Sequence, residues 1–304
     1  MASVTVRAPA KINLQLAVGA VRKDGFHQVA TAYQAVSLVD EVVATTSDEL
    51  SVSVSGATGV SVEEVPTDDS NLAAVAVAAL ARHVDVPPAV RLHITKGIPV
   101  AGGMAGGSAD AAAALVACDA LWQTGLPRQE LARIAAGLGS DVPFSLVGGT
   151  ALGTGRGEVL MPVLARGRFH WVVALADGGL STPDVYARCD RLRADRAVAQ
   201  PRVSDALMSA LRAGDAEALG RALRNDLQEA ALSLRPALRQ TLDTGREAGA
   251  LGGLVSGSGP TVAMLARDPE HAIDIAVALS ATGTCRAVKR AYGPVAGARL
   301  VGES

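Results

Sequence analysis

The first third of the chain alternates between hydrophobic and polar positions, with the period of two that half-buried β-strands require. The alternation runs over residues 3–8 and again over residues 13–18. Short β-branched runs bounded by turn residues follow at 34–39, 40–46 and 50–54. The pattern therefore predicts a β-rich beginning that is built from several short strands.

A helical period replaces this alternation after residue 70. Apolar residues recur at helical spacing over residues 72–83, and Ser70 or Asn71 is in place to cap that helix. The pattern then predicts, in order, a strand at 90–96, helices at 110–122 and 128–138, and a glycine-rich hairpin at 148–157. A strand, a glycine-rich loop and a helix in this order are what an anion cradle requires.

The second half of the chain mixes the two periods. Strands are predicted at 170–175, 262–265 and 286–291, and helices from 181 onward and at 204–213, 216–225, 236–248 and 268–281. Helices gathered on one face of a sheet are typical of an α+β domain. We therefore predict an α+β protein of two domains, residues 1–160 and 161–304, in which the N-terminal domain is β-rich and the C-terminal domain is α+β.

The segment Pro99–Ala109, called the phosphate loop below, places four glycines and Ser108 directly before the helix at 110–122. Glycine lets backbone N–H groups approach an anion closely, and the positive end of the following helix points at the same place. Gly107 is followed by Ser108 where a Walker A loop needs Lys, and the dinucleotide pattern GxGxxG is not matched. The alternative is a plain glycine-rich turn, but four glycines and a serine exceed what a turn needs.

The composition narrows the class of protein. A net charge of −2 without a basic run argues against a nucleic-acid partner. The three cysteines are far apart and favour neither a disulfide framework nor a zinc site. The sequence has neither the apolar core of a signal peptide nor an apolar stretch of membrane-spanning length. We therefore expect a cytoplasmic protein without a membrane partner.

Three separated segments, Ala8–Leu14, Pro99–Ala109 and Gly252–Thr261, together resemble the motifs of the GHMP kinase superfamily over essentially the whole chain. Shorter matches lie at 22–27, 139–143 and 256–260. They point to a branch whose alcohol substrate carries a cytidine diphosphate group. The resemblance implies an ATP-dependent small-molecule kinase with its active site in the cleft between two domains. Mg²⁺ is implied by the chemistry of ATP, and its ligands stay unassigned.

The resemblance also assigns catalytic roles. Phosphoryl transfer needs alignment and charge neutralisation, with a base beside the attacking hydroxyl. By resemblance Asp141 accepts the proton of the alcohol, and Lys11 keeps Asp141 ionised while it offsets charge on the transferred group. Considered alone, Asp141 could cap a short helix that begins near Pro143, and Lys11 could be a solvated charge on a strand edge.

ATP binding is expected at the phosphate loop, at Lys96 and at the segment Gly252–Thr261, called the second glycine loop below. The expected residues are Lys96, Pro99, Val100, Ala101, Gly102, Gly103, Met104, Ala105, Gly106, Gly107, Ser108, Ala109, Ser256, Gly257, Ser258 and Gly259. Ser108 could donate to a phosphate or bind Mg²⁺, and Lys96 could reach the nucleotide or face water. The second glycine loop is expected to pack beside the phosphate loop. Its alternative is an ordinary hairpin, which we favour for Gly153–Gly157.

The resemblance places Asn13, Phe26, His27 and Tyr186 at the alcohol substrate. Phe26 and Tyr186 are expected to sandwich the pyrimidine, at about 1–3 kcal/mol per stacked base, while His27 binds the base edge and Asn13 lies beside the alcohol. Considered alone, Phe26 fits a core role, His27 a surface role and Asn13 a turn cap. For the whole chain the alternatives are a homoserine- or mevalonate-type kinase and a non-catalytic nucleotide-binding regulator. We expect a monomer or weak homodimer whose partners are ATP and the cytidyl alcohol.

Overall fold

The computed structural model describes residues 2–100, 102–194 and 196–302. Its longest elements are two antiparallel strands, β1 (Ser3–Val21) and β2 (His27–Thr46), which pair along almost their whole length. The strands that join them in one sheet are β3 (Ser51–Gly56), β4 (Val90–Lys96), β5 (Thr150–Thr154), β6 (Val159–Pro162), β8 (Arg224–Asn225) and β12 (Arg299–Leu300). The main path of this sheet runs β12-β1-β2-β4-β3, with β5 beside β2 and β8 beside β1.

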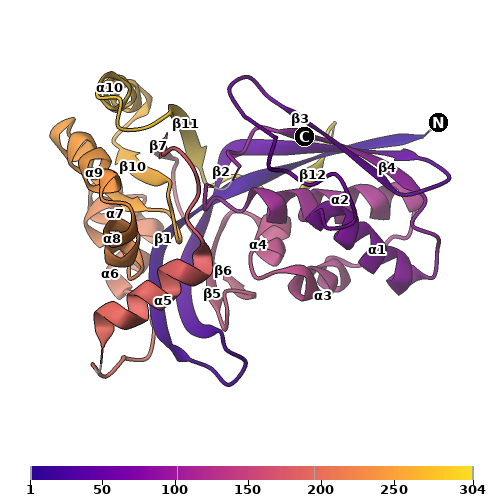
Figure 1. The fold of residues 1–304 in the computed structure, drawn as a ribbon, viewed down its shortest axis with the longest axis horizontal. Coiled ribbons are helices and arrows are strands. Elements are labelled where there is room, and N and C mark those ends of the chain that lie inside the picture. The colour runs from indigo at the N-terminus through magenta and orange to yellow at the C-terminus, as the bar shows by residue number, and fades with distance from the viewer. Residues whose placement is uncertain (1, 101, 195, 303–304) are drawn as a thin grey trace.

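One face of this sheet is covered by four helices (Figure 1). They are α1 (Leu72–Val84), α2 (Gly106–Trp122), α3 (Arg128–Leu138) and α4 (Val142–Val147). The central helix α2 packs on β1 and β2 and buries a run of alanines, whose small side chains let the helix lie close to the sheet. Of the two expected caps for α1, the structure uses Asn71, whose side chain accepts a hydrogen bond of 2.9 Å from the N–H of Ala73.

The second half of the chain builds a smaller antiparallel sheet with its own helices (Figure 1). Its strands are β7 (Phe169–Leu175), β9 (Gly252–Val255), β10 (Val262–Ala266) and β11 (Ala287–Gly293), in the order β11-β7-β10-β9. Its helices are α5 (Thr182–Arg193), α6 (Asp205–Ala213), α7 (Ala216–Ala222), α8 (Gln228–Leu234), α9 (Ala237–Glu247) and α10 (Pro269–Ala281). The α+β fold is confirmed. The domain division at residue 160 stays a prediction, and β8 and β12 pair with β1 across it.

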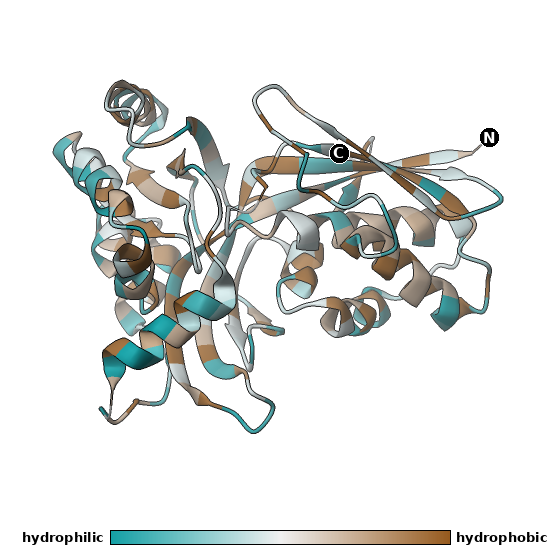
Figure 2. Cartoon of the chain, in the orientation of Figure 1, coloured by the Kyte–Doolittle hydropathy of each residue, from teal (hydrophilic) through white to brown (hydrophobic). Residues whose placement is uncertain are grey.

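Hydrophobic residues concentrate in the strands and in the helices that pack on them, while α5 carries a largely hydrophilic surface (Figure 2). Only Val185 and Cys189 of α5 are buried. None of the helices in the described ranges is long and apolar enough to span a bilayer. Helix α5 therefore lies at the surface of the molecule, beside the ends of β1 and β2.

The N-terminal strands are longer than the alternation predicts. The segments at 3–8 and 13–18 belong to the single strand β1, and those at 34–39 and 40–46 belong to β2. The β1–β2 pairing shifts register between Pro9 and Ala10 and again after Asn13. Each irregularity shifts the phase of the hydrophobic and polar alternation along the strand. In addition, residues 8–16 are all buried, so this stretch has no exposed positions to alternate with. The local period therefore breaks although the strand continues.

Other differences arise where tertiary contacts override the local pattern. Helix α2 begins four residues before the predicted start, because Ala105 adopts a left-handed conformation (φ 61°) that turns the chain directly into the helix. The helix predicted at 216–225 ends at Ala222, since the Asn225 amide donates to the carbonyl oxygens of Val255 and Gly257, both at 2.7 Å. The short elements α8, β8, β9 and β12 are missed. The remaining predicted helices and strands are present, including the hairpin of β5 and β6.

Candidate active site

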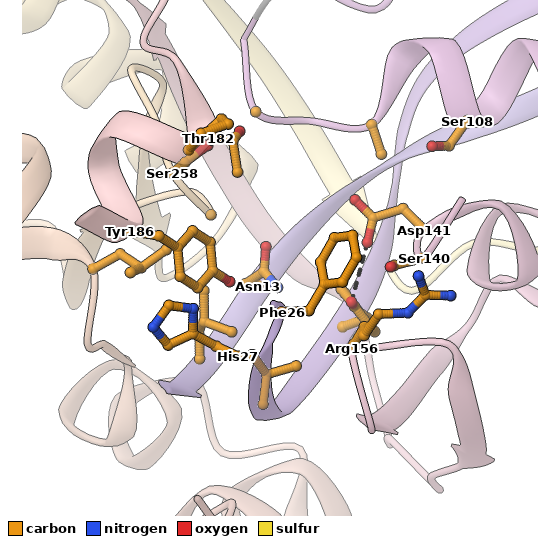
Figure 3. A pocket seen from close by; sticks show the side chains of 18 of the residues that line it. Asn13, Phe26, His27, Ser108, Ser140, Asp141, Arg156, Thr182, Tyr186 and Ser258 are labelled. Atoms are coloured by element: carbon orange, nitrogen blue, oxygen red, sulfur yellow. Dashed lines mark hydrogen bonds between the residues drawn. The ribbon is translucent and has the colours of Figure 1, made fainter. Parts of the chain in front are cut away.

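A cavity of about 700 Å³ lies where the two glycine loops, the ends of β1 and β2, and α5 come together. Figure 3 shows side chains from these distant parts of the chain pointing into one space. Ser108 from the phosphate loop and Asp141 from the start of α4 line the same cavity, as the expected cleft requires. The cavity is therefore the place at which the residues proposed from the motifs can act together.

Lys11 and Asn13 reach this cavity from one face of β1, because strand residues two positions apart share a face. Lys11 is 6% exposed, and its Nζ donates to Oδ1 of Asn13 at 2.7 Å. The amide of Asn13 donates in turn to the hydroxyl of Thr31 on β2 at 2.8 Å. Lys11 is thus buried and oriented, and the alternative of a solvated strand-edge charge is wrong. Asn13 lies within β1 and does not cap a turn.

Asp141 occupies the N-cap position of α4, but its side chain makes no capping hydrogen bond to that helix. Its Oδ2 lies 3.5 Å from Nζ of Lys11, and its Oδ1 accepts a hydrogen bond of 3.0 Å from the hydroxyl of Tyr33. The side chain keeps 29% exposure, and it lines the cavity. The capping alternative thus holds for the position of Asp141 but not for its side chain, whose carboxylate is oriented with one side open to the cavity.

Tyr33 is a residue of the site that sequence reasoning misses. It lies in β2 opposite Asn13, and its ring stacks on that of Phe144 in α4 with the centroids 4.9 Å apart. Burial, and then the charge of Asp141, raise the pKa of Tyr33 well above its usual value. The hydroxyl therefore stays protonated and donates to Asp141. The only signal in the sequence is that aromatic residues are scarce, at 3% of the chain, so that each one is a candidate to contact a flat ligand ring.

The two glycine loops meet above Lys11. A Cβ atom on Gly103 would lie 2.8 Å from the carbonyl oxygens of both Ser256 and Gly259, and its φ of 68° also favours glycine. A Cβ atom on Gly257 would lie 3.5 Å from Nζ of Lys11. The second glycine loop thus packs on the phosphate loop, as expected. The segment is also part of a hairpin, because its first four residues form β9 and pair with β10, which directly follows it.

Five of the residues expected to bind ATP line the cavity: Gly103, Ala105, Ser108, Gly257 and Ser258. The other described members of that set do not line it, and Ala101 lies outside the described residues. The hydroxyls of Ser256 and Thr261 are buried at the junction of the loops and have no hydrogen-bond partner among the described residues. Backbone N–H groups, hydroxyls and the Lys11 ammonium are thus gathered in one place, and this donor set fits a triphosphate.

Lys96 faces neither the cavity nor water. It is 2% exposed, and its ammonium bonds to the carboxylates of Asp40 and Asp110, the latter at 2.6 Å. Burial disfavours its charge, but Asp110 and Asp40 outweigh burial and raise the pKa of Lys96. Burial raises the pKa of Asp110 to about 8, against the attraction of Lys96. A Cβ atom on Gly106 would lie 3.2 Å from this ammonium, so Lys96 packs directly against the phosphate loop. It therefore supports the loop and does not reach a ligand itself.

The expected pyrimidine-binding residues gather in another part of the same cavity. The rings of His27 and Tyr186 are 4.9 Å apart, and Nε2 of His27 lies 3.0 Å from the carboxylate of Asp190. Phe26 is 53% exposed, and the guanidinium of Arg156 lies 5.0 Å from its ring centroid. Phe26 is therefore not a core residue, and the side chain of His27 is mostly enclosed. Sequence reasoning misses Asp190 and Arg156, which both line the cavity.

A metal ion would find few protein ligands here. Within the described ranges, no group of three or more His, Cys, Asp or Glu side chains could hold a metal. Mg²⁺ usually keeps several waters and binds one or two carboxylates together with substrate phosphates. Asp141 and Ser108 offer oxygen ligands at the cavity wall. The donor set therefore fits an ion that enters with a triphosphate, not one that resides in a cage of side chains.

Comparison with known proteins agrees with the motifs. Family models described as "GHMP kinases N terminal domain" and "GHMP kinases C terminal" match residues 71–149 and 207–285. The 4-diphosphocytidyl-2-C-methyl-D-erythritol kinase of Thermobifida fusca is 59% identical over an alignment that covers 98% of each chain. The chain belongs to the GHMP kinase family.

Two further relatives of this GHMP kinase carry the same activity in their names. The 4-diphosphocytidyl-2-C-methyl-D-erythritol kinase of Streptomyces coelicolor is 59% identical over 98% of this chain and 99% of its own. A crystal structure of 4-(cytidine 5'-diphospho)-2C-methyl-D-erythritol kinase superposes with a TM-score of 0.76 at 32% identity, covering 95% of this chain and 98% of that one. The resemblance drawn from the motifs is confirmed, and the protein is an ATP-dependent small-molecule kinase.

Proposed function

We propose that this GHMP kinase transfers the γ-phosphoryl group of ATP to the 2-hydroxyl of 4-diphosphocytidyl-2-C-methyl-D-erythritol, a step of non-mevalonate isoprenoid precursor biosynthesis. The observation that carries the proposal is the continuity of one cavity. It joins the glycine loops and the Lys11–Asp141 pair to the group formed by Phe26, His27 and Tyr186. One substrate can therefore hold a cytidine among the aromatic rings while its alcohol faces the carboxylate.

Asp141 accepts the proton of the 2-hydroxyl as the new O–P bond forms and the bond between the γ-phosphorus and the β–γ bridging oxygen of ATP breaks. Lys11 lies 3.5 Å from this carboxylate, favours its ionised form and places positive charge beside the transferred group. Tyr33 donates to the other carboxylate oxygen at 3.0 Å and fixes its direction. Oδ1 of Asn13 accepts a hydrogen bond of 2.7 Å from the Lys11 ammonium, and Asn13 lies where the alcohol would enter the cavity.

The glycine loops bind the triphosphate through backbone N–H groups and through the hydroxyls of Ser108 and Ser258, both of which line the cavity. Mg²⁺ would neutralise phosphate charge when bound, and Ser108, which lines the cavity, is the residue placed to hold it. Lys96 acts on ATP through the loop that it supports, because its ammonium is already engaged by Asp40 and Asp110.

Phe26 and Tyr186 stack on the cytosine ring. Burial raises the pKa of Tyr186 to about 12, so its ring stays neutral at physiological pH. His27 forms a hydrogen bond with the edge of the base. Its Nε2 is already hydrogen-bonded to the carboxylate of Asp190, so Nδ1 is the ring nitrogen available for that contact.

A coupled ADP-release assay with 4-diphosphocytidyl-2-C-methyl-D-erythritol, homoserine and mevalonate tests the proposal. We expect turnover with the cytidyl alcohol alone. Turnover of homoserine or mevalonate without turnover of the cytidyl alcohol would assign the chain to another GHMP kinase activity. ATP binding without turnover of any of the three would favour a nucleotide-binding regulator.

We further infer that the protein acts in the cytoplasm as a monomer or weak homodimer, with ATP and the cytidyl alcohol as partners. A net charge of −2 without a basic run supports the absence of a nucleic-acid partner. Light scattering over a range of protein concentrations measures the oligomeric state directly, and a concentration-independent dimer or tetramer would contradict this inference.

A further inference from the structure

The turn at residues 154–158 joins β5 to β6 and is rich in glycine, yet the proposed function gives it no task. Sequence reasoning treats Gly153–Gly157 as a hairpin, and the antiparallel pairing of β5 with β6 confirms that reading of its backbone. The turn nevertheless places Arg156 in the wall of the active-site cavity. A conformational role for the glycines and a chemical role for the arginine are therefore compatible.

The turn is held firmly against Tyr33. A Cβ atom on Gly153 would lie 2.6 Å from Cε2 of Tyr33, and one on Gly157 would lie 2.3 Å from its hydroxyl oxygen. Gly157 also has a φ of 113°, which side chains other than hydrogen rarely allow. The same hydroxyl donates to Asp141, so the backbone that carries Arg156 is fixed relative to the carboxylate of the site. The backbone of Arg156 therefore has a defined position relative to Asp141.

Arg156 also stands out by charge. In the described part of the chain, Lys11 and Arg156 are the only Lys or Arg residues that line this cavity. Lys11 already faces Asp141 at 3.5 Å. Arg156 has an ion-pair contact only with Glu158, at 3.9 Å from its Nε, and its terminal guanidinium nitrogens have no hydrogen-bond partner among the described residues. Arg156 is thus the cavity cation that remains available to a ligand.

We propose that Arg156 binds the diphosphate of the cytidyl alcohol through its terminal guanidinium nitrogens; this rests on the proposed function. The diphosphate connects the cytidine, placed near Phe26 and Tyr186, to the alcohol, placed near Asp141. In Figure 3, Arg156 lies on the Asp141 side of Phe26, whereas Tyr186 lies on the other side. A planar guanidinium forms paired hydrogen bonds with phosphate oxygens, and its contact with the Phe26 ring at 5.0 Å holds its plane.

The charge of Arg156 also affects which alcohols the cavity accepts. Asp141 and Asp190 line the same cavity and repel a polyanion that lacks a counter-charge. Arg156 offsets this repulsion midway along the path of the cytidyl alcohol. It therefore favours alcohols that carry a diphosphate over small alcohols of similar reactivity.

The test compares Arg156→Ala and Arg156→Lys with the parent enzyme in steady-state kinetics. We expect Arg156→Ala to raise the KM for the cytidyl alcohol about tenfold to a hundredfold, as loss of a charged hydrogen-bond pair predicts. The kcat and the KM for ATP should change less than about threefold. The reason is that the lost contact binds the cytidyl alcohol equally in the ground state and in the transition state, and does not touch ATP. Arg156→Lys should recover part of the loss. Arg168→Ala is the matched control, since the Arg168 guanidinium lies 4.3 Å from the Tyr292 ring centroid and Arg168 does not line the cavity.

Calorimetric binding of CDP and of cytidine separates a diphosphate contact from a base contact. The proposal expects Arg156→Ala to weaken CDP and to leave cytidine unchanged. Unchanged KM and unchanged CDP affinity in the variant, with an active parent enzyme, would overturn the role of Arg156 and leave the proposed function standing. An equal loss for CDP and cytidine together with a lower kcat would also overturn it, since that result marks a collapsed turn. Failure of the parent enzyme to use the cytidyl alcohol would refute the proposed function itself, whereas an active parent enzyme that does not bind CDP would overturn only the diphosphate contact.

Discussion

Replacing Asp141 by Asn is the most direct test of the chemistry proposed for this kinase. The change keeps the shape of the side chain and leaves an amide oxygen that can accept the Tyr33 hydroxyl, now 3.0 Å from Oδ1. It removes the negative charge 3.5 Å from Lys11 and abolishes proton acceptance by the carboxylate. The variant therefore isolates the charge and basicity of Asp141 from its position.

The structure predicts a large effect on rate and a smaller one on stability. General base catalysis contributes about 10²- to 10⁴-fold, which corresponds to about 3–5.5 kcal/mol of activation free energy. The Lys11–Asp141 pair is only partly exposed, with 7% exposure for the Lys11 side chain and 29% for that of Asp141, so its loss should cost more than the about 1 kcal/mol of a surface pair and less than the about 3–5 kcal/mol of a buried one. We therefore expect kcat to fall by at least a hundredfold while Tm changes by a few degrees.

The assay combines coupled ADP release with calorimetric ATP binding. The Kd for ATP should stay within about threefold of the parent value, because catalytic contacts of this type act mainly in the transition state. Asp184→Asn is a suitable control, since Asp184 lies in the first turn of α5 and does not line the cavity. A kcat within threefold of the parent would remove Asp141 from the mechanism, and a parallel loss of ATP affinity would assign it to nucleotide binding instead.

Three further changes probe the support of the phosphate loop. Gly103→Ala should raise the KM for ATP and lower Tm, because its Cβ would lie 2.8 Å from the Ser256 and Gly259 carbonyl oxygens; kinetics and thermal melts that match the parent would refute this packing. Lys96→Met should cost about 3–5 kcal/mol of unfolding free energy, because it leaves the buried side chains of Asp40 and Asp110 without the ammonium that both contact; a urea titration measures it, and a loss under 1 kcal/mol would contradict the account. Asp110→Asn should flatten the pH dependence of stability. Folding raises the pKa of Asp110 to about 8, from about 4 in the unfolded chain. The folded parent retains a proton between these values that the unfolded chain has lost, so its unfolding free energy should fall as pH rises through this range; an equally steep profile in the variant would be the contrary result.

Much of the site could be predicted from local patterns because its backbone machinery is local. The glycines of the phosphate loop, the helix that follows and the hairpin that holds the second glycine loop each occupy one continuous segment. Lys11 and Asp141 were found through their motifs. The sequence pattern alone left Asp141 equally compatible with a helix cap. It does occupy the N-cap position of α4, and only the tertiary structure shows that its carboxylate contacts Tyr33 and Lys11 and makes no capping hydrogen bond.

The residues that sequence reasoning missed or misplaced share one property, which is that their partners are distant in the chain. Tyr33 looks like any residue of a buried strand until α4 brings Asp141 to its hydroxyl. Arg156 looks like a turn residue until the hairpin is docked against Tyr33. Lys96 looks exposed until Asp40 and Asp110 enclose its ammonium. Periodicity and turn chemistry report on neighbours in sequence, so they carry no information about these pairs.

The sequence by itself determined the α+β class, the order of most helices and strands, the two glycine loops and the kinase family. Each of these depends on propensities and spacings within short segments. Only the tertiary structure decided that β1 and β2 run unbroken through their irregular registers, that Lys96 is buried, and that Tyr33 and Arg156 belong to the site. The physical reason is that burial and charge pairing depend on where distant segments meet, and that is set by the packing of the whole chain.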